Sequence, residues 1–166
     1  FTVPGVPMSV QGQEFLNDRT FEDDRPLDGE VAARMEGITH LYRDLIALRR
    51  NLEGISCGLA GQHVAVHHVN SEAKALAFHR WSEGGPGDSV VVVINLSNNP
   101  LLDYAIGFPA GGAWELCFDS HHASYDPEYD GQVSRSVEAV AGECDGLGYE
   151  AAVSVAPYSA VILALS

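Results

Sequence analysis

The chain has 166 residues, a formal net charge of −14 and a hydrophobic fraction of 46%. A chain of this length usually forms one domain, or one domain with an appendage, and buries a sizeable core. Its acidic surface repels the phosphates of nucleic acids and of anionic lipids, which argues against both as partners but not against a neutral sugar polymer. No apolar run approaches the roughly 20 residues that span a bilayer, so we expect no membrane segment.

The first fifteen residues read FTVPGVPMSVQGQEF. Pro4 and Pro7 each lack a backbone donor, which disfavours a central strand at those positions. Residues 8–10 can be extended, and Gly12 lets the backbone turn sharply at their end. Glu14 then lies just beyond a short strand, which in a parallel α/β barrel is a position that lines the active site. The alternative is a surface turn with an incidental glutamate.

A polar, turn-rich loop over residues 16–28 precedes a segment with helical periodicity. Asp28 is the expected N-cap, and Gly54 is the expected stop signal. The apolar side chains between them recur at spacings of three and four, at Val31, Met35, Ile38, Tyr42 and Leu45. Such spacing predicts one amphipathic helix over residues 30–51 that packs on a sheet.

From residue 62 onward the hydrophobic period changes from helical to strand-like, with clusters of Gly, Pro, Asn and Asp between the apolar runs. Short strands at such spacing are typical of an antiparallel sandwich. Residues 90–94 are continuously apolar, as expected for a strand covered on both faces. The predicted strands comprise residues 62–69, 74–81, 89–96, 102–108, 113–118, 132–140, 149–155 and 160–165.

The cysteines and histidines do not predict a metal site or a cofactor. Cys57, Cys117 and Cys144 are an odd set without ligand-type spacing, which indicates reduced thiols and favours a cytoplasmic location. His63 and His67 on one strand lie about 13 Å apart at 3.3 Å per residue, too far to share an ion. We therefore expect packed or hydrogen-bonded sheet histidines.

Aromatic side chains are the candidates for stacking on a sugar ring, because their faces suit the apolar face of glucose. Trp81 lies in an alternating strand and is expected in the core. Tyr125 and Tyr129 lie in the irregular stretch of residues 119–131, so they are the surface candidates for substrate binding.

Several strings resemble one enzyme family. Gly5-x-Pro7, followed by Gly12-x-Glu14, resembles the motif at the eighth barrel strand of the α-amylase superfamily, and the fuller string PGVPM…QGQEF resembles the 1,4-α-glucan branching enzymes. The string LYRDLI…LRRN is similar to their last barrel helix. Other strings resemble the all-β domain that follows the barrel in these enzymes: VHHVN, AFHRW, VVVIN, IGFP and PYSA.

The resemblance implies a mainly β fold: an antiparallel β-sandwich preceded by the last strand and helix of a TIM barrel. Residues 1–54 are then a barrel remnant and residues 55–166 the sandwich. We expect the carboxyl-terminal piece of a longer protein, since the chain opens within the motif. Its partners are then the remainder of the barrel and an α-glucan such as glycogen or amylose, and self-association through the exposed remnant is expected.

The same resemblance implies an enzyme that cleaves an α-1,4 linkage by double displacement and rejoins the chain through an α-1,6 bond. Retaining chemistry of this kind uses two carboxyl groups about 5 Å apart. In the family these groups lie on earlier barrel strands, so this chain is expected to hold no catalytic residue and to be inactive alone. Glu14, with Gln13 beside it, matches a substrate-binding position. The alternatives are another hydrolase or debranching enzyme of the superfamily, and a non-enzymatic glucan-binding sandwich.

Overall fold

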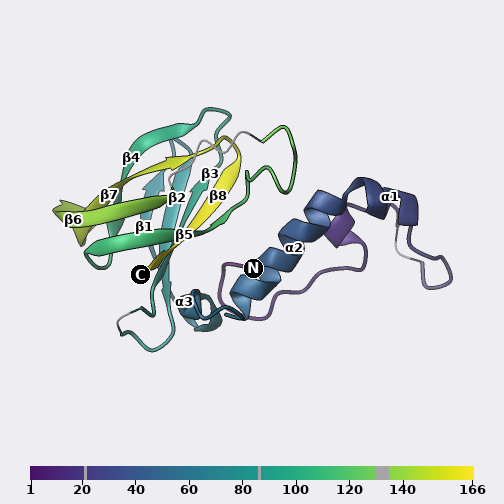
Figure 1. Ribbon diagram of the computed structural model, residues 1–166, viewed down its shortest axis with the longest axis horizontal. Coiled ribbons are helices and arrows are strands. Elements are labelled where there is room, and N and C mark those ends of the chain that lie inside the picture. The colour runs from purple at the N-terminus through teal and green to yellow at the C-terminus, as the bar shows by residue number, and fades with distance from the viewer. Residues whose placement is uncertain (21, 86, 130–134) are drawn as a thin grey trace.

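The computed structural model describes residues 1–20, 22–85, 87–129 and 135–166. An extended N-terminal segment and short helices lie beside a larger body of strands (Figure 1). The helical elements are η1 (Gln13–Phe15), α1 (Gly29–Arg34), α2 (Glu36–Arg49) and α3 (Cys57–Ala60). Within the described ranges no helix is long and apolar enough to cross a membrane.

Eight antiparallel strands form one curled sheet in the order β1-β2-β3-β8-β5-β6-β7-β4. They are β1 (His63–Asn70), β2 (Ala75–Trp81), β3 (Val90–Asn95), β4 (Leu101–Phe108), β5 (Gly112–Asp119), β6 (Ser136–Cys144), β7 (Leu147–Val155) and β8 (Ser159–Leu165). The curl brings the β6–β7–β4 layer over the other strands, and side chains from both layers fill the space between them. Trp114, Phe108 and Ile106 are fully buried there. The predicted sandwich is therefore confirmed.

All eight predicted strands occur in the structure within a few residues of their expected positions. The apolar run of β3 is fully covered, since Val91, Val92 and Val93 are each 0% exposed. The predicted strand over residues 132–140 is observed from Ser136, while its residues 132–134 lie outside the described part of the chain. The turn between β6 and β7 is a two-residue one, with positive φ at both Asp145 and Gly146, as Asp-Gly favours in hairpins,.

The predicted single helix over residues 30–51 is wrong, because the structure has two helices that meet at Met35. Asp28 caps α1 as expected, since its side chain accepts hydrogen bonds from the backbone of Glu30 and Val31. Met35 then leaves helical dihedrals, with φ −104° and ψ 30°. Gly37 follows two residues after the break, in the first turn of α2, and its low helix propensity weakens the helical pattern in this region,.

The C-terminal half of α2 packs on the outer face of the sheet. Leu48 is buried in one cluster with Phe78 and Ile162, and Leu41 and Leu45 pack against it while remaining partly exposed. The expected helix-on-sheet packing is thus confirmed for the last turns of α2. Figure 1 shows the rest of the helix extending away from the strands, toward α1.

No strand forms over residues 8–10, so the strand expected there is absent from this structure. Val6 and Met8 are 95% and 92% exposed. An extended segment becomes a strand only when a neighbouring strand supplies hydrogen-bond partners, and no described strand pairs with these residues.

Candidate functional site

The turn that carries Gln13 and Glu14 is held by its own side chains. The carboxylate of Glu14 accepts a hydrogen bond from the Gly12 N–H at 2.9 Å, and the amide oxygen of Gln13 accepts one from the Val10 N–H at 2.8 Å. Gly12 has φ 94°, and a Cβ there would lie 2.8 Å from the Cβ of Asn17. Only glycine fits that close approach without strain, so the sequence fixes the turn that orients Glu14.

A hollow of about 360 Å³ lies between this turn and one face of α2. The backbone carbonyl of Glu14 accepts a hydrogen bond from the Thr39 hydroxyl at 3.1 Å, which ties the turn to the helix. Ile46 and Leu52 in the lining are 42% and 60% exposed. The full lining consists of Glu14, Thr39, Tyr42, Arg43, Ile46, Ala47 and Leu52. Such a largely apolar surface is a candidate for contact with another part of a protein.

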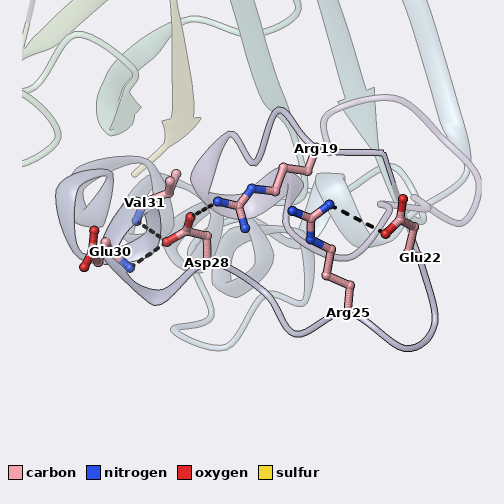
Figure 2. A network of polar contacts seen from close by, with 6 residues as sticks. All are labelled: Arg19, Glu22, Arg25, Asp28, Glu30 and Val31. Carbon is pink, nitrogen blue, oxygen red and sulfur yellow. Dashed lines mark hydrogen bonds and ion pairs between the residues drawn. The ribbon is translucent and has the colours of Figure 1, made fainter.

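Two ion pairs lie in the polar segment before α1, and Figure 2 shows both of them. Arg19 pairs with Asp28 at 2.5 Å, and Arg25 pairs with Glu22 at 3.6 Å. Asp28 also caps α1, and the Val31 N–H, followed by that of Glu30 and by the Arg19 charge, lowers the pKa of its carboxyl despite partial desolvation. A polar hollow of about 440 Å³ lies here, and its lining includes Gln11 and Asn17 as well as Arg19, Glu22 and Arg25. Its hydrogen-bonding groups suit a polyhydroxylated ligand.

Tyr125 lies against α2 rather than standing free. Its hydroxyl donates a hydrogen bond to the Asp44 carboxylate at 2.6 Å, and its ring lies 6.0 Å from that of Phe118. Burial, and then the neighbouring Asp44, raise the pKa of Tyr125. The helix approaches so closely that a Cβ on Gly37 would lie 1.8 Å from the Tyr125 carbonyl oxygen. Tyr125 is therefore a contact between the β5–β6 loop and the helix.

Two of the four expected substrate-binding residues, Glu14 and Tyr125, line different hollows of the described structure. Tyr125 lines a separate hollow of about 250 Å³ together with Asp44, Leu48 and Cys117. Glu14 lines the hollow beside Ile46 and Leu52, whose lining includes neither Tyr125 nor Tyr129. Tyr129 stacks on the His121 ring at 4.1 Å, half-buried on the β5–β6 loop.

A partly buried polar network that the sequence pattern does not predict joins β1 and β4, the two edge strands of the curled sheet. His68 on β1 hydrogen-bonds Asp145 at 2.8 Å and the Tyr104 hydroxyl at 3.0 Å, while Asn70 donates to the same hydroxyl at 2.8 Å. Burial acts to raise the pKa of Asp145, but the hydrogen bonds from His68 and from the Gly107 N–H outweigh it and hold the pKa below its usual value. In the sequence, the Asp-Gly pair predicts the β6–β7 turn that carries Asp145, but it does not predict the partners of Asp145.

His63 and His79 are packed or hydrogen-bonded, as expected, whereas both ring nitrogens of the half-buried His67 lack a hydrogen-bond partner among the described residues. His79 contacts the Ser89 hydroxyl at 3.0 Å and stacks on Trp81 at 4.6 Å, and His63 stacks on the same indole at 5.2 Å. Burial, followed by the charge of His67, lowers the pKa of His79 to about 4. The register places His79 opposite Ala65, not opposite another histidine. The described residues contain no group of three or more side chains that could hold a metal ion.

Comparison with known families finds a match to "Alpha amylase, C-terminal all-beta domain" over residues 65–166. The 1,4-alpha-glucan branching enzyme of Nitrosococcus oceani is 27% identical over 99% of this chain. The enzyme of the same name from Pseudomonas syringae is 32% identical over 75% of the chain. These alignments cover 22% and 17% of the two relatives, so the chain spans about a fifth of their length.

Solved structures show the same fold at low sequence identity. A pullulanase from an Anoxybacillus species superposes on 99% of this chain with a TM-score of 0.59 and 18% identity, using 21% of its own length. A mutant pullulanase from Paenibacillus barengoltzii, solved with maltotriose, covers 93% of the chain with a TM-score of 0.56 and 20% identity, using 22% of its own length. At these identities the likeness concerns the fold alone.

Proposed function

Because the chain belongs to the family of α-amylase C-terminal all-β domains, we propose that it forms the carboxyl-terminal, non-catalytic part of a 1,4-α-glucan branching enzyme. The likeness to the Nitrosococcus oceani enzyme carries this proposal, because an alignment over 99% of the chain also covers nearly all of residues 1–64, which precede the family match. The parent would cleave an α-1,4 linkage and transfer the freed chain to a 6-hydroxyl, forming an α-1,6 branch. The catalytic carboxylates would lie outside residues 1–166.

The role of this part is then to complete and support the barrel. The apolar hollow between Glu14 and α2 supports this, because Ile46 and Leu52 face it and are substantially exposed. Val6 and Met8 add apolar surface just before the turn. The remainder of the barrel would cover these side chains, and residues 8–10 would gain the neighbouring strand that they lack here. Residues 1–54 are in this proposal the barrel remnant, and residues 55–166 the sandwich.

We also propose that the turn at Glu14 and the β5–β6 loop contact the glucan. The ordered turn presents Gln13 and Glu14, and the polar loop of Figure 2 follows it directly. Tyr129, half-buried on a loop and stacked on His121, is the proposed tyrosine for stacking on a sugar with its other ring face, whereas Tyr125 packs on Phe118 and is held by Asp44. The three free cysteines agree with a reducing compartment, so we place the parent in the cytoplasm of a cell that stores glycogen,.

The decisive experiment replaces the matching carboxyl-terminal fifth of the Nitrosococcus oceani enzyme with this chain. The hybrid is expected to lower the iodine staining of amylose and to create α-1,6 linkages detectable by proton NMR. This chain alone is expected to do neither. Hydrolysis without new α-1,6 linkages would favour a hydrolase of the same superfamily, and turnover by the purified chain alone would contradict the proposal. Circular dichroism of the hybrid shows whether an inactive hybrid is folded.

A second experiment tests whether this chain binds the glucan directly or only supports the barrel. Electrophoresis of the chain through a gel containing glycogen measures binding directly, with Tyr129→Ala and Tyr125→Phe as the two variants. Retardation that Tyr129→Ala removes and Tyr125→Phe keeps would support contact through Tyr129. Strong retardation of the chain combined with an inactive, folded hybrid would instead favour the non-enzymatic glucan-binding sandwich.

A further inference from the structure

Arg80 is a fully buried cation within the body of strands. It lies on β2, on the same face as Phe78, and 0% of its surface is exposed. No carboxylate in the described ranges lies within ion-pair distance of it, since the ion pairs found there involve other residues. A buried charge without a counter-ion is costly unless its hydrogen bonds are all satisfied.

Backbone carbonyl groups satisfy the Arg80 guanidinium from several segments at once. Nη2 donates to the carbonyls of Gly61 at 2.5 Å and of Leu59 at 3.1 Å, and Nε donates to that of His63 at 3.0 Å. Nη1 donates to the carbonyl of Thr2, which is 78 residues away in the chain. The planar guanidinium, with five N–H donors, suits such a ring of acceptors.

A second arginine makes the same kind of contact from α2. Arg49 donates through Nη1 to the Leu59 carbonyl at 2.6 Å, and through Nη2 to the carbonyl of Gly5. The two guanidinium groups therefore share the Leu59 carbonyl, and each also holds one carbonyl of the N-terminal segment, that of Thr2 for Arg80 and that of Gly5 for Arg49. Leu59 itself is 1% exposed, in the core cluster that also contains Leu48 and Phe78.

We propose that Arg80 and Arg49 form a two-arginine clasp, which fastens residues 1–5 and the end of α2 onto the sandwich so that the whole chain unfolds as one unit. This proposal predicts that residues 1–54 and residues 55–166 do not unfold independently. The reason is that the carbonyl acceptors of the clasp come from both sides of residue 55. The clasp depends only on contacts within residues 1–166, so its test is independent of any enzymatic activity. It also places the start of the segment that leads to Gly12 and Glu14 at a fixed position on the strands.

The first test uses the intact chain and the neighbouring pair Arg49→Met and Arg50→Met. Arg50 is exposed and donates no described side-chain hydrogen bond, so it is the matched control. Arg49→Met is expected to raise the hydrogen-exchange rate of amides in residues 1–10 about tenfold and to lower the melting temperature by roughly 5 °C. Arg50→Met should change neither. Equal hydrogen-exchange rates and equal melting temperatures of the two variants would contradict the proposed clasp.

The second test asks whether Arg80 acts through the N-terminal segment. Arg80→Lys keeps the charge but cannot reach all four carbonyls, and it is expected to lower the melting temperature by roughly 10 °C. Deletion of residues 1–5 should lower it too, and the double variant should lose clearly less than the sum of the two shifts. Strict additivity would show that Arg80 supports only the sandwich, and the proposal would fail.

Discussion

At the scale of single residues, the end of the sandwich near Trp81 is sensitive to protonation. His79 packs against the Trp81 ring and contacts Ser89, and burial lowers its pKa to about 4. In the unfolded chain the same imidazole has a pKa near 6.5. As the pH falls below 6.5, the unfolded state takes up the proton first, so the free energy of unfolding decreases until the pH reaches about 4.

We therefore expect the protein to lose stability between pH 6.5 and pH 4, by at most about 3 kcal/mol from His79. Urea denaturation at pH 7, 5.5 and 4.5 measures the loss, and His79→Gln should flatten it because glutamine does not titrate. His122→Gln, at an exposed position of the β5–β6 loop, is the control and should follow the wild type. A His79→Gln variant with an unchanged pH profile would contradict the assignment.

At the scale of elements, the contact between α2 and the β5–β6 loop depends on a missing side chain. A Cβ at Gly37 would lie 1.8 Å from the carbonyl oxygen of Tyr125, whereas a Cβ at Gly29 in α1 would meet nothing within 4 Å. Alanine normally stabilises a helix relative to glycine by about 0.5–1 kcal/mol. The steric contact at Gly37 therefore turns the usual stabilisation by alanine into a destabilisation. At Gly29, where there is no such contact, the usual stabilisation remains.

Gly37→Ala is accordingly expected to destabilise the protein by roughly 1–3 kcal/mol, since the loop must move away and the hydrogen bond between Tyr125 and Asp44 is strained. Gly29→Ala should be neutral or slightly stabilising. Thermal unfolding followed by circular dichroism compares the two variants directly. A stabilising Gly37→Ala substitution would mean that the loop does not rest on the helix in solution.

Local patterns sufficed to predict the strands but not the contacts between segments. The alternation in residues 75–81 and the apolar run of β3 predicted strands, because sheet faces impose a period of two. The same alternation does not indicate which segments cover a sheet face. It therefore could not predict that Arg80 is buried among backbone carbonyls or that His68 pairs with Asp145. Residues 8–10 have an extended pattern but form no strand, because no described strand pairs with them.

At the scale of the whole molecule, exposed apolar side chains concentrate in the N-terminal third. Val6, Met8, Ile46 and Leu52 are each at least 42% exposed. Burying one such side chain contributes roughly 1.5–3 kcal/mol, which favours association with whatever apolar surface is at hand. In the absence of the rest of a barrel, a second copy of the chain offers that surface.

The isolated chain should therefore self-associate in a concentration-dependent way, and Ile46→Asp should shift it toward the monomer by placing a charge in the apolar hollow. Val69→Asp is the control, because Val69 is 69% exposed but lies on β1 of the sandwich. Sedimentation velocity at several concentrations distinguishes the two variants. A wild-type chain that stays monomeric at all concentrations would exclude association through this surface.

The position of β8 has a consequence for how the protein is made. This strand pairs with β3 on one side and β5 on the other, so it occupies the middle of the sheet although it follows all seven other strands in the chain. During synthesis, which proceeds at roughly 5–20 residues per second, β3 leaves the ribosome several seconds before its neighbour exists. Until then the β8-facing edge of β3 lacks its hydrogen-bond partners, and such an unpaired edge is prone to aggregation,. The sheet therefore closes only after translation has passed residue 165, and a chain that ends before β8 leaves β1-β2-β3 and β5-β6-β7-β4 as two separate half-sheets.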